Sequence, residues 1–370
     1  MRSGLVLALT AALTLSACGA EATGDPELTI YLSAPLSGPR AADGRDVADG
    51  ARLALAEAGT ESAGTTVLLE VLDDGNEGGW DAATAAANAR RATEDSSAIA
   101  FLGDLDSGAT RSSLPITNEA GILQVSPGSG AEDLTRDVPG SSQVPDLVQP
   151  TGNRTFGRVV PSDRAQAEAA AGWMSALGIR SVEILMDESN FAESLRAGIE
   201  AGDGPAIDAG GADATYVATA DLEGSASSSA PRGRGSVFGS DALLDPADLK
   251  ALGTLGDRAM LTAAALAPSQ LPAGADEFLR AFRAEYGRDP GPYAAYGYEA
   301  MAVTLDAIGR AEDPLDRAAV IDAFFATADR ESVLGTYSID EVGDTTLGRL
   351  GAYEVAGGRT EPLPESLERG

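Results

Sequence analysis

Two loops of small, hydroxylated and acidic residues are the parts of this 370-residue chain best suited to binding a solute. Each loop follows an apolar stretch typical of a buried strand and leads toward a helix, so its backbone N–H groups would lie at a helix N-terminus. Unpaired amides and the helix dipole favour an anion there, although serine and glycine at helix starts are also common caps and turns. The pattern indicates a site for a carboxylate or another anion. The loops run from Gly103 to Thr110, with Ser107 and Gly108, and from Ser126 to Leu134, with Gly128, Ser129 and Gly130.

The absence of histidine excludes most of the catalytic chemistry that such loops otherwise support. Ser-His-Asp and Cys-His catalysis need an imidazole, as do histidine-ligated zinc and iron sites. Asp104 and Asp106 resemble the start of a calcium loop, but Pro115 takes the twelfth position, where a bidentate glutamate is required. Gly128-Ser129-Gly130 lacks the third glycine of a dinucleotide fingerprint. We expect no cofactor and no metal. The enzymatic alternative that stays open is a hydrolase using two carboxylates.

Cys18 is the only cysteine, and its position indicates export rather than catalysis. An apolar stretch from Leu5 to Leu15 follows Arg2 and is too short to cross a bilayer, which is typical of a secretory signal. Small residues precede Cys18 and resemble a bacterial lipobox; an ordinary signal peptide with an incidental cysteine is the alternative. We expect residues 1–17 to be a lipoprotein signal peptide and residues 18–27 a tether. The exported protein would be lipid-anchored to the outer face of the cell membrane.

The composition predicts an acidic protein with two lobes. Lysine and arginine total 26 against 57 aspartate and glutamate residues, which gives a formal net charge of -31. Such a surface repels phosphate backbones, so we expect no nucleic-acid partner. After the signal about 350 residues remain, which is more than one hydrophobic core usually organises.

Apolar strands alternate with helices of about ten to fifteen residues, which favours parallel sheets with helices on both faces. The alternation restarts in the second part of the chain, so we expect an α/β protein with two doubly wound lobes. The stretch Gly224–Gly235 is low in complexity and is expected to be a flexible surface loop. Strands are predicted at 28–32, 67–72, 99–102, 122–125 and 182–186, and helices at 47–59, 80–93, up to 120, 165–177 and 191–201.

A series of short motifs resembles the branched-chain amino-acid-type (Leu/Ile/Val-binding) extracellular substrate-binding lipoproteins of ABC importers. The motifs run in order from about Leu28 to Tyr353, and the ordered series is more specific than any single motif. They include Pro35-Leu36-Ser37-Gly38, Asp73-Asp74, Asn118-Glu119-Ala120-Gly121-Ile122, Phe238-Gly239-Ser240-Asp241 and Ala295-Tyr296-Gly297-Tyr298-Glu299-Ala300. The resemblance implies a type I periplasmic-binding-protein fold that closes on a ligand by hinge motion. Three crossover segments would join lobe 1 (28–157 plus 267–334) to lobe 2 (158–266 plus 335–370).

The resemblance also implies roles for individual residues. Ser107, beside Gly108, would hydrogen-bond a ligand carboxylate, with the backbone from Gly128 to Gly130 completing that pocket. Asp241 would face the ligand ammonium from the other lobe, so that each charge of a zwitterion meets its complement. Phe191 and Tyr296 would be aromatic residues at the cleft. The structural alternatives are core aromatics for Phe191 and Tyr296, a turn or N-cap residue for Asp241, and a structural role for Ser129.

Three departures from the family pattern concern the ligand. Gly130 stands where amino-acid binders often have threonine, and Asp43 stands where an aromatic residue often covers the ligand. Residues 221–236 are rich in serine and glycine in place of a regular helix. Asp43 and Asp241 together would favour a ligand richer in positive charge, such as a basic amino acid, an amide or a polyamine.

The leading functional hypothesis is a non-enzymatic, lipid-anchored receptor for an amino acid or a related small polar ligand. Its partners would be that small-molecule ligand, an ABC permease and the membrane, through the lipid anchor. A ligand-sensing lipoprotein without a transport role would have the same fold, and the sequence does not separate the two.

Overall fold

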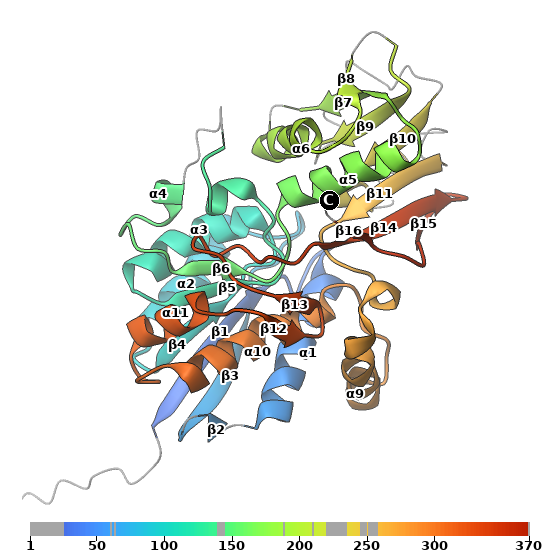
Figure 1. The fold of residues 1–370 in the computed structure, drawn as a ribbon. Coiled ribbons are helices and arrows are strands. Elements are labelled where there is room, and N and C mark those ends of the chain that lie inside the picture. Colours follow the sequence, from blue (N-terminus) through green and yellow to red (C-terminus); the bar gives the residue numbers. More distant parts are fainter. Residues whose placement is uncertain are drawn as a thin grey trace, which may run out of the picture.

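Two sheets, each flanked by helices, form two lobes (Figure 1). The computed structural model describes residues 26–59, 61–62, 64–138, 145–187, 189–208, 211–219, 235–244, 250 and 258–368. The expected signal peptide, Cys18 and nearly all of the Gly224–Gly235 stretch lie outside the described residues. Among the helices of the described part, none combines the length and the apolar character that a membrane span needs.

The first lobe is built on a six-stranded sheet in the order β2-β3-β1-β4-β5-β6. All its neighbouring strands pair in parallel except β2, which pairs antiparallel with β3. Every residue of β4 is buried, as expected for a parallel strand covered on both faces. The strands are β1 (Glu27–Ala34), β2 (Glu61–Ser62), β3 (Thr65–Asp73), β4 (Ala98–Leu102), β5 (Leu123–Ser126) and β6 (Phe156–Arg158).

The second lobe is built on an eight-stranded sheet in the order β15-β14-β11-β10-β9-β7-β8, with β16 paired to β14. Strands β7 to β11 pair in parallel, whereas β14 adds an antiparallel edge beside β11. The strands are β7 (Ser181–Met186), β8 (Ala206–Ile207), β9 (Ala214–Ala218), β10 (Ser236–Gly239), β11 (Ala259–Ala263), β14 (Arg349–Ala356), β15 (Arg359–Pro362) and β16 (Leu367–Glu368). A separate hairpin pairs β12 (Arg330–Ser332) with β13 (Gly335–Tyr337).

The parallel strands of both lobes have the same order. Numbered along the chain within each lobe, β3-β1-β4-β5-β6 and β8-β7-β9-β10-β11 both read 2-1-3-4-5. In this doubly wound order the loops diverge between the first and third strands, and ligands bind in the crevice at their carboxyl ends. The topology therefore predicts a binding crevice beside β1 and β4 in one lobe and beside β7 and β9 in the other.

Close helix packing supports the first lobe, in which α1 and α10 cross at two glycines. A Cβ at Gly50 would lie 2.0 Å from the Ala294 carbonyl oxygen, and one at Gly297 would lie 2.2 Å from that of Val47, so side chains are excluded there. In the second lobe α5 and α6 pack together over one face of the sheet. The longer helices are α1 (Ala41–Ala58), α2 (Ala82–Glu94), α3 (Ser107–Glu119), α5 (Asp163–Ala176), α6 (Asn190–Ala201), α9 (Asp276–Tyr286), α10 (Ala294–Arg310) and α11 (Arg317–Phe325). The short ones are η1 (Glu132–Leu134), α4 (Pro145–Val148), η2 (Asp241–Leu244), η4 (Pro268–Gln270) and η5 (Ala273–Ala275).

The chain crosses between the lobes three times: between β6 and α5, between β11 and α9, and between β13 and β14. The third crossing lies later than the boundary after residue 334 that the sequence suggested. Tyr337, Ile339 and Leu347 all pack in the hydrophobic core of the first lobe. Because these side chains belong to that core, the chain leaves the first lobe only after Leu347.

The expected α/β class, with two doubly wound lobes, is confirmed. Each strand and helix predicted from apolar periodicity is present within a few residues of its expected bounds. The largest difference is α1, which begins at Ala41 rather than near residue 47. Its first turns contain Asp43, Gly44 and Arg45, whose polarity hides the helical pattern there.

A cavity between the two lobes

An open cavity of about 1030 Å³ lies where the carboxyl ends of both parallel sheets face each other. Pro39 and Arg40 follow β1, and Ser107 follows β4, so one side is the predicted crevice of the first lobe. Ser189 and Phe191 follow β7 on the opposite side. The cavity is lined by Pro39, Arg40, Asp43, Gly78, Leu105, Asp106, Ser107, Gly108, Arg111, Gly128, Gly130, Ala131, Asp163, Ser189, Asn190, Phe191, Asp241, Ala242, Leu244, Ala263, Ala265, Pro292, Tyr293 and Tyr353.

The N-terminus of α3 is less open to an anion than the sequence suggested. The carboxylate of Asp106 caps the helix and accepts a hydrogen bond of 2.9 Å from the Gly108 amide. Gly108 itself packs so closely on Trp80 that a Cβ would lie 2.2 Å from the indole ring. Asp106 therefore occupies the position in which a ligand carboxylate would otherwise meet the Gly108 amide.

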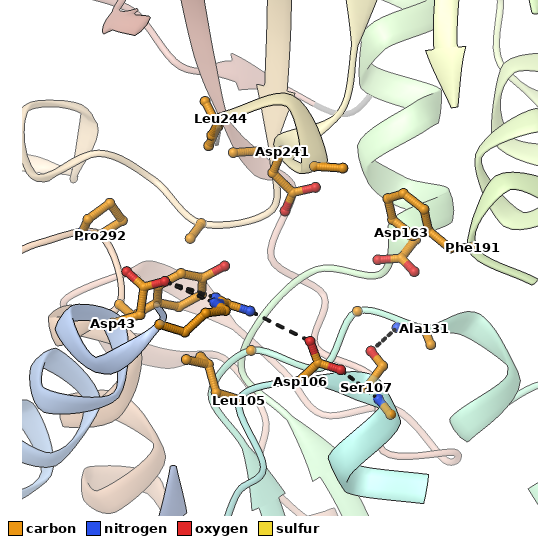
Figure 2. A pocket seen from close by; sticks show the side chains of 18 of the residues that line it. Asp43, Leu105, Asp106, Ser107, Ala131, Asp163, Phe191, Asp241, Leu244 and Pro292 are labelled. Carbon is orange, nitrogen blue, oxygen red and sulfur yellow. Dashed lines mark hydrogen bonds and ion pairs between the residues drawn. The ribbon is translucent and has the colours of Figure 1, made fainter. Parts of the chain in front are cut away.

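Ser107 and Gly130 retain free hydrogen-bonding capacity toward the cavity. The Ser107 hydroxyl accepts a hydrogen bond of 3.1 Å from the Ala131 amide, which leaves its own proton available for an acceptor (Figure 2). The Gly130 amide has no acceptor among the described residues, whereas the Gly128 amide donates to the Ser126 hydroxyl at 3.2 Å. A ligand carboxylate placed here would meet the Ser107 hydroxyl and the Gly130 amide.

Ser129 does not line the cavity. Its side chain is fully buried, its hydroxyl donates to the Asp104 carbonyl oxygen at 3.0 Å, and it lies 2.7 Å from the Thr110 hydroxyl. These bonds fix the loop between β5 and η1 against the start of α3. Ser129 therefore shapes the backbone around Gly130, in keeping with the structural alternative.

Arg40 forms ion pairs with two acidic side chains of the first lobe, those of Asp43 and Asp106. Its guanidinium lies 3.0 Å from the Asp43 carboxylate and 3.7 Å from that of Asp106, over the ring of Tyr293. Burial raises the pKa of Tyr293 to about 12, although the charge of Arg40 opposes the rise. Asp43 thus lines the cavity, as expected, but an arginine that the sequence analysis missed already neutralises it.

Two further carboxylates project into the cavity from the second lobe (Figure 2). Asp241 begins η2 and accepts a long hydrogen bond of 3.3 Å from the Gln166 side chain. Burial raises the pKa of Asp241, and the Gln166 bond and the charge of Arg40 oppose that rise. Asp163 is the first residue of α5 and is 8% exposed. Burial raises the pKa of Asp163 to about 7, and the Asp241 carboxylate adds to the rise, whereas the charges of Arg158 and Arg111 oppose it.

The two expected aromatic residues have different positions. Phe191 lines the cavity from the first turn of α6, beside Asp163 (Figure 2). Tyr296 is fully buried in the core of the first lobe, where its hydroxyl donates to the Ala264 carbonyl oxygen at 3.2 Å and accepts from the Leu266 amide at 3.1 Å. Tyr293 takes the place at the cavity that was assigned to Tyr296.

A side-chain hydrogen bond joins the two lobes beside the cavity. Asp133 of the first lobe accepts a hydrogen bond of 3.1 Å from the Asn190 side chain, which begins α6 in the second lobe. The other oxygen of Asp133 lies 2.5 Å from Arg111. This contact joins the lobes beside the ligand space.

Metal binding has no support in the described residues, where no group of three or more acidic or other ligating side chains is arranged to hold an ion. The cavity instead offers hydrogen-bond donors on one lobe and carboxylates on the other, with Phe191 and Tyr293 as apolar surfaces. This arrangement suits reversible binding of a small polar molecule.

The sequence analysis missed Arg40, Asp163 and Tyr293. Asp163 directly follows Ser162, the N-cap residue of α5. Acidic residues are common in the first turn of a helix, so Asp163 did not stand out as a binding residue. Tyr293 was within reach, because it stands only three residues before Tyr296 in the same tyrosine-rich segment. Nothing in the sequence marked Arg40 as a binding residue except that it closely follows the motif Pro35-Leu36-Ser37-Gly38.

Two doubly wound lobes, joined by three crossings around a shared cavity, are the architecture of a type I periplasmic-binding-protein fold. The family model described as periplasmic binding protein matches residues 27–230 and 205–358. The chain therefore belongs to the periplasmic binding protein family, whose members bind solutes, and the resemblance seen in its motifs is confirmed.

Solved structures with this fold cover nearly the whole chain. A leucine-binding protein from Thermotoga maritima MSB8 shares 23% identity, with a TM-score of 0.67 over 91% of this chain and 97% of the other. The isoleucine complex of a branched-chain amino-acid transporter substrate-binding protein from Streptococcus pneumoniae shares 20%, with a TM-score of 0.70 over 92% and 99%. A solute-binding protein from Rhodopseudomonas palustris BisB5, in complex with 3,4-dihydroxybenzoic acid, shares 17%, with a TM-score of 0.67 over 92% and 96%. No curated protein gives a significant match.

Proposed function

We propose that this protein is an extracellular, lipid-anchored solute receptor that captures an amino acid or a related small polar molecule and delivers it to an ABC permease. The lobes would close on the ligand by bending at the three crossings. Capture involves no covalent step. Cys18 would carry the lipid that holds the receptor at the outer face of the membrane.

The single observation that carries this proposal is the complementary chemistry of the two cavity walls. Ser107 and Gly130 offer a hydroxyl and an amide on the first lobe, whereas Asp241 presents a carboxylate from the second. A zwitterion bound between them would place its carboxylate and its ammonium against opposite partners. Structural neighbours in complex with isoleucine and with leucine support the choice of an amino acid.

Thermal unfolding of the chain from residue 19 onward, screened against amino acids, amides, polyamines and small sugars, tests the proposal. A ligand at a hundredfold excess over its dissociation constant stabilises the native state by about 2.7 kcal/mol, which raises Tm by roughly 2–5 °C. We expect such a rise with amino-acid-like compounds. A rise with sugars alone would contradict the proposed ligand class, and no rise with any class would contradict solute capture.

A further inference from the structure

The Asp163 carboxyl group is buried at the cavity, and the described residues give it no hydrogen-bond or ion-pair partner. Its backbone amide donates to the Gly130 carbonyl oxygen at 2.8 Å, which fixes the residue at the first crossing. No described residue donates a hydrogen bond to its carboxylate or lies in an ion pair with it, although the residue is only 8% exposed. A buried polar group is normally satisfied, so this carboxylate is poised for a group that the protein does not supply.

Gly130 leaves room for this carboxylate. A Cβ at position 130 would lie 2.2 Å from Asp163 Oδ1, well inside van der Waals contact. Any side chain at position 130 would therefore displace Asp163. Gly130 of the first lobe therefore leaves the space that the Asp163 carboxyl group of the second lobe occupies.

The charges lining the cavity do not balance. Arg40 faces Asp43 and Asp106, and Arg111 faces Asp133, so both arginines of the lining are already paired. Asp163 and Asp241 have no arginine or lysine in an ion pair with them among the described residues. Figure 2 shows both carboxylates directed into the same space, above Ser107 and Asp106.

We propose that Asp163 and Asp241 together bind a solute with two cationic nitrogens, such as a basic amino acid or a diamine. This inference rests on the proposed function and names the charge of its ligand. It replaces the acidic pair suggested by the sequence, because Asp43 is neutralised by Arg40 whereas Asp163 is not. A zwitterion with one ammonium would give a cationic partner to only one of the two carboxyl groups.

Isothermal titration calorimetry of the mature chain with matched ligands tests the inference. Lysine and norleucine have similar length and differ by the terminal ammonium, and cadaverine lacks the carboxylate of lysine. We expect lysine to bind roughly tenfold or more tightly than norleucine, since a buried carboxylate gains its counter-charge. Tighter binding of lysine than of cadaverine would identify a basic amino acid, and the reverse would identify a diamine.

Asp163→Asn provides the matching variant. It should lower the affinity for the dicationic ligand by about tenfold or more, but it should not lower the affinity for norleucine, which has no second cation to lose. Asp276→Asn is the control, because Asp276 is exposed and is also the first residue of a helix. Thermal unfolding without ligand shows whether each variant is folded.

The outcomes separate the inference from the function on which it rests. Norleucine binding as tightly as lysine, or lysine binding unchanged by Asp163→Asn, would overturn the two-cation site and leave amino-acid capture standing. No binding of any amino acid or diamine would overturn both.

Discussion

The Arg158 guanidinium and the Asp344 carboxylate form an ion pair of 2.7 Å that joins the segments of the first lobe just before the first and the third crossings. Arg158 ends β6 and is fully buried, and its Nη1 also donates to the carbonyl oxygens of Ser129 and Ala131, at 3.1 and 2.8 Å. One side chain thus connects two hinge segments to the loop that contains Gly130.

Arg158→Met should destabilise the protein and weaken ligand binding together. Removing one partner of a buried ion pair costs about 3–5 kcal/mol, and the Gly130 loop would lose two donors. Urea denaturation and calorimetry measure the two effects. Arg349→Met is the control, because the exposed pair of Arg349 with Glu368 contributes less than about 1 kcal/mol. Stability equal to that of the control would contradict the role of Arg158.

Asp241→Asn should weaken binding of an ammonium-bearing ligand by roughly 1–3 kcal/mol. The substitution keeps the size of the side chain and its contact with Gln166, but it removes the charge that faces the ligand cation. Calorimetry with the ligand found by thermal screening measures the change. Unchanged affinity in a folded variant would remove Asp241 from the binding site.

Gly130→Ala should reduce affinity through a steric effect on Asp163. The added Cβ would lie 2.2 Å from Asp163 Oδ1, so the carboxylate must move. The same clash should also lower the stability of the Gly130→Ala protein. The double variant Gly130→Ala/Asp163→Gly removes the clash, so it should recover the stability but not the affinity for a dicationic ligand. Calorimetry and thermal unfolding of both variants distinguish the two effects, and a Gly130→Ala protein with normal affinity would contradict the steric match.

A buried pair of carboxyl groups, those of Asp74 and Asp104, should make the stability of the first lobe fall as pH rises. Asp74 Oδ1 and Asp104 Oδ1 are buried, and neither has a hydrogen-bond partner among the described residues. Burial raises the pKa of Asp74 to about 6, and burial together with the Asp74 charge raises the pKa of Asp104 well above its ordinary value. The folded state therefore binds protons more tightly than the unfolded state. Its advantage is complete below the unfolded pKa and is lost as pH rises through about 6.

Asp74→Asn tests this pH dependence. Urea denaturation between about pH 4 and pH 7 should show a decline in the unfolding free energy that is smaller in the variant, by on the order of 1–3 kcal/mol. Asp163 contributes a decline of the same sign in both proteins, so the difference isolates the buried pair. Asp146→Asn, at an exposed position, should keep the full decline. An Asp74→Asn protein with the same decline as the unchanged protein would show that the Asp74 and Asp104 carboxyl groups do not cause it.

Cys18→Ser should release the protein from the membrane without changing ligand affinity. The thiol is the only group in the chain that can take a thioether-linked lipid, and Cys18 precedes the described fold by several residues. Fractionation of cells that express each form measures the anchoring. Persistent membrane association of the Cys18→Ser protein would contradict the lipobox prediction.

The sequence predicted the fold well because parallel strands buried on both faces leave continuous apolar runs. The stretch Ile99–Leu102 is apolar at every position, which is typical of a parallel strand whose two faces are both covered. The third crossing was placed too early because the β12–β13 hairpin carries no signal of which core it joins. The hairpin belongs to the first lobe because Tyr337 packs in the core of that lobe. This packing involves residues far away in the sequence, so the local sequence pattern does not predict it.

The site was predicted by loop position more reliably than by side-chain role. Ser107, Gly130, Phe191 and Asp241 all line the cavity because the carboxyl ends of parallel strands meet there. The contact of Arg40 with Asp106 was not predictable, because these residues lie far apart in the sequence, whereas Asp43 stands only three residues after Arg40. Asp163 was missed because its chemistry depends on an absent side chain at Gly130, more than thirty residues away.

The core of the first lobe contains both Leu28 and Leu347, which lie near opposite ends of the described part of the chain. A ribosome or a secretion channel therefore delivers the opening strands long before the segment that completes their packing. Until that last segment arrives, the nascent polypeptide has no finished lobe to resist being threaded through a narrow pore. The interleaved chain path thus delays completion of this lobe until nearly the whole chain is available, which suits the export that we propose for this protein.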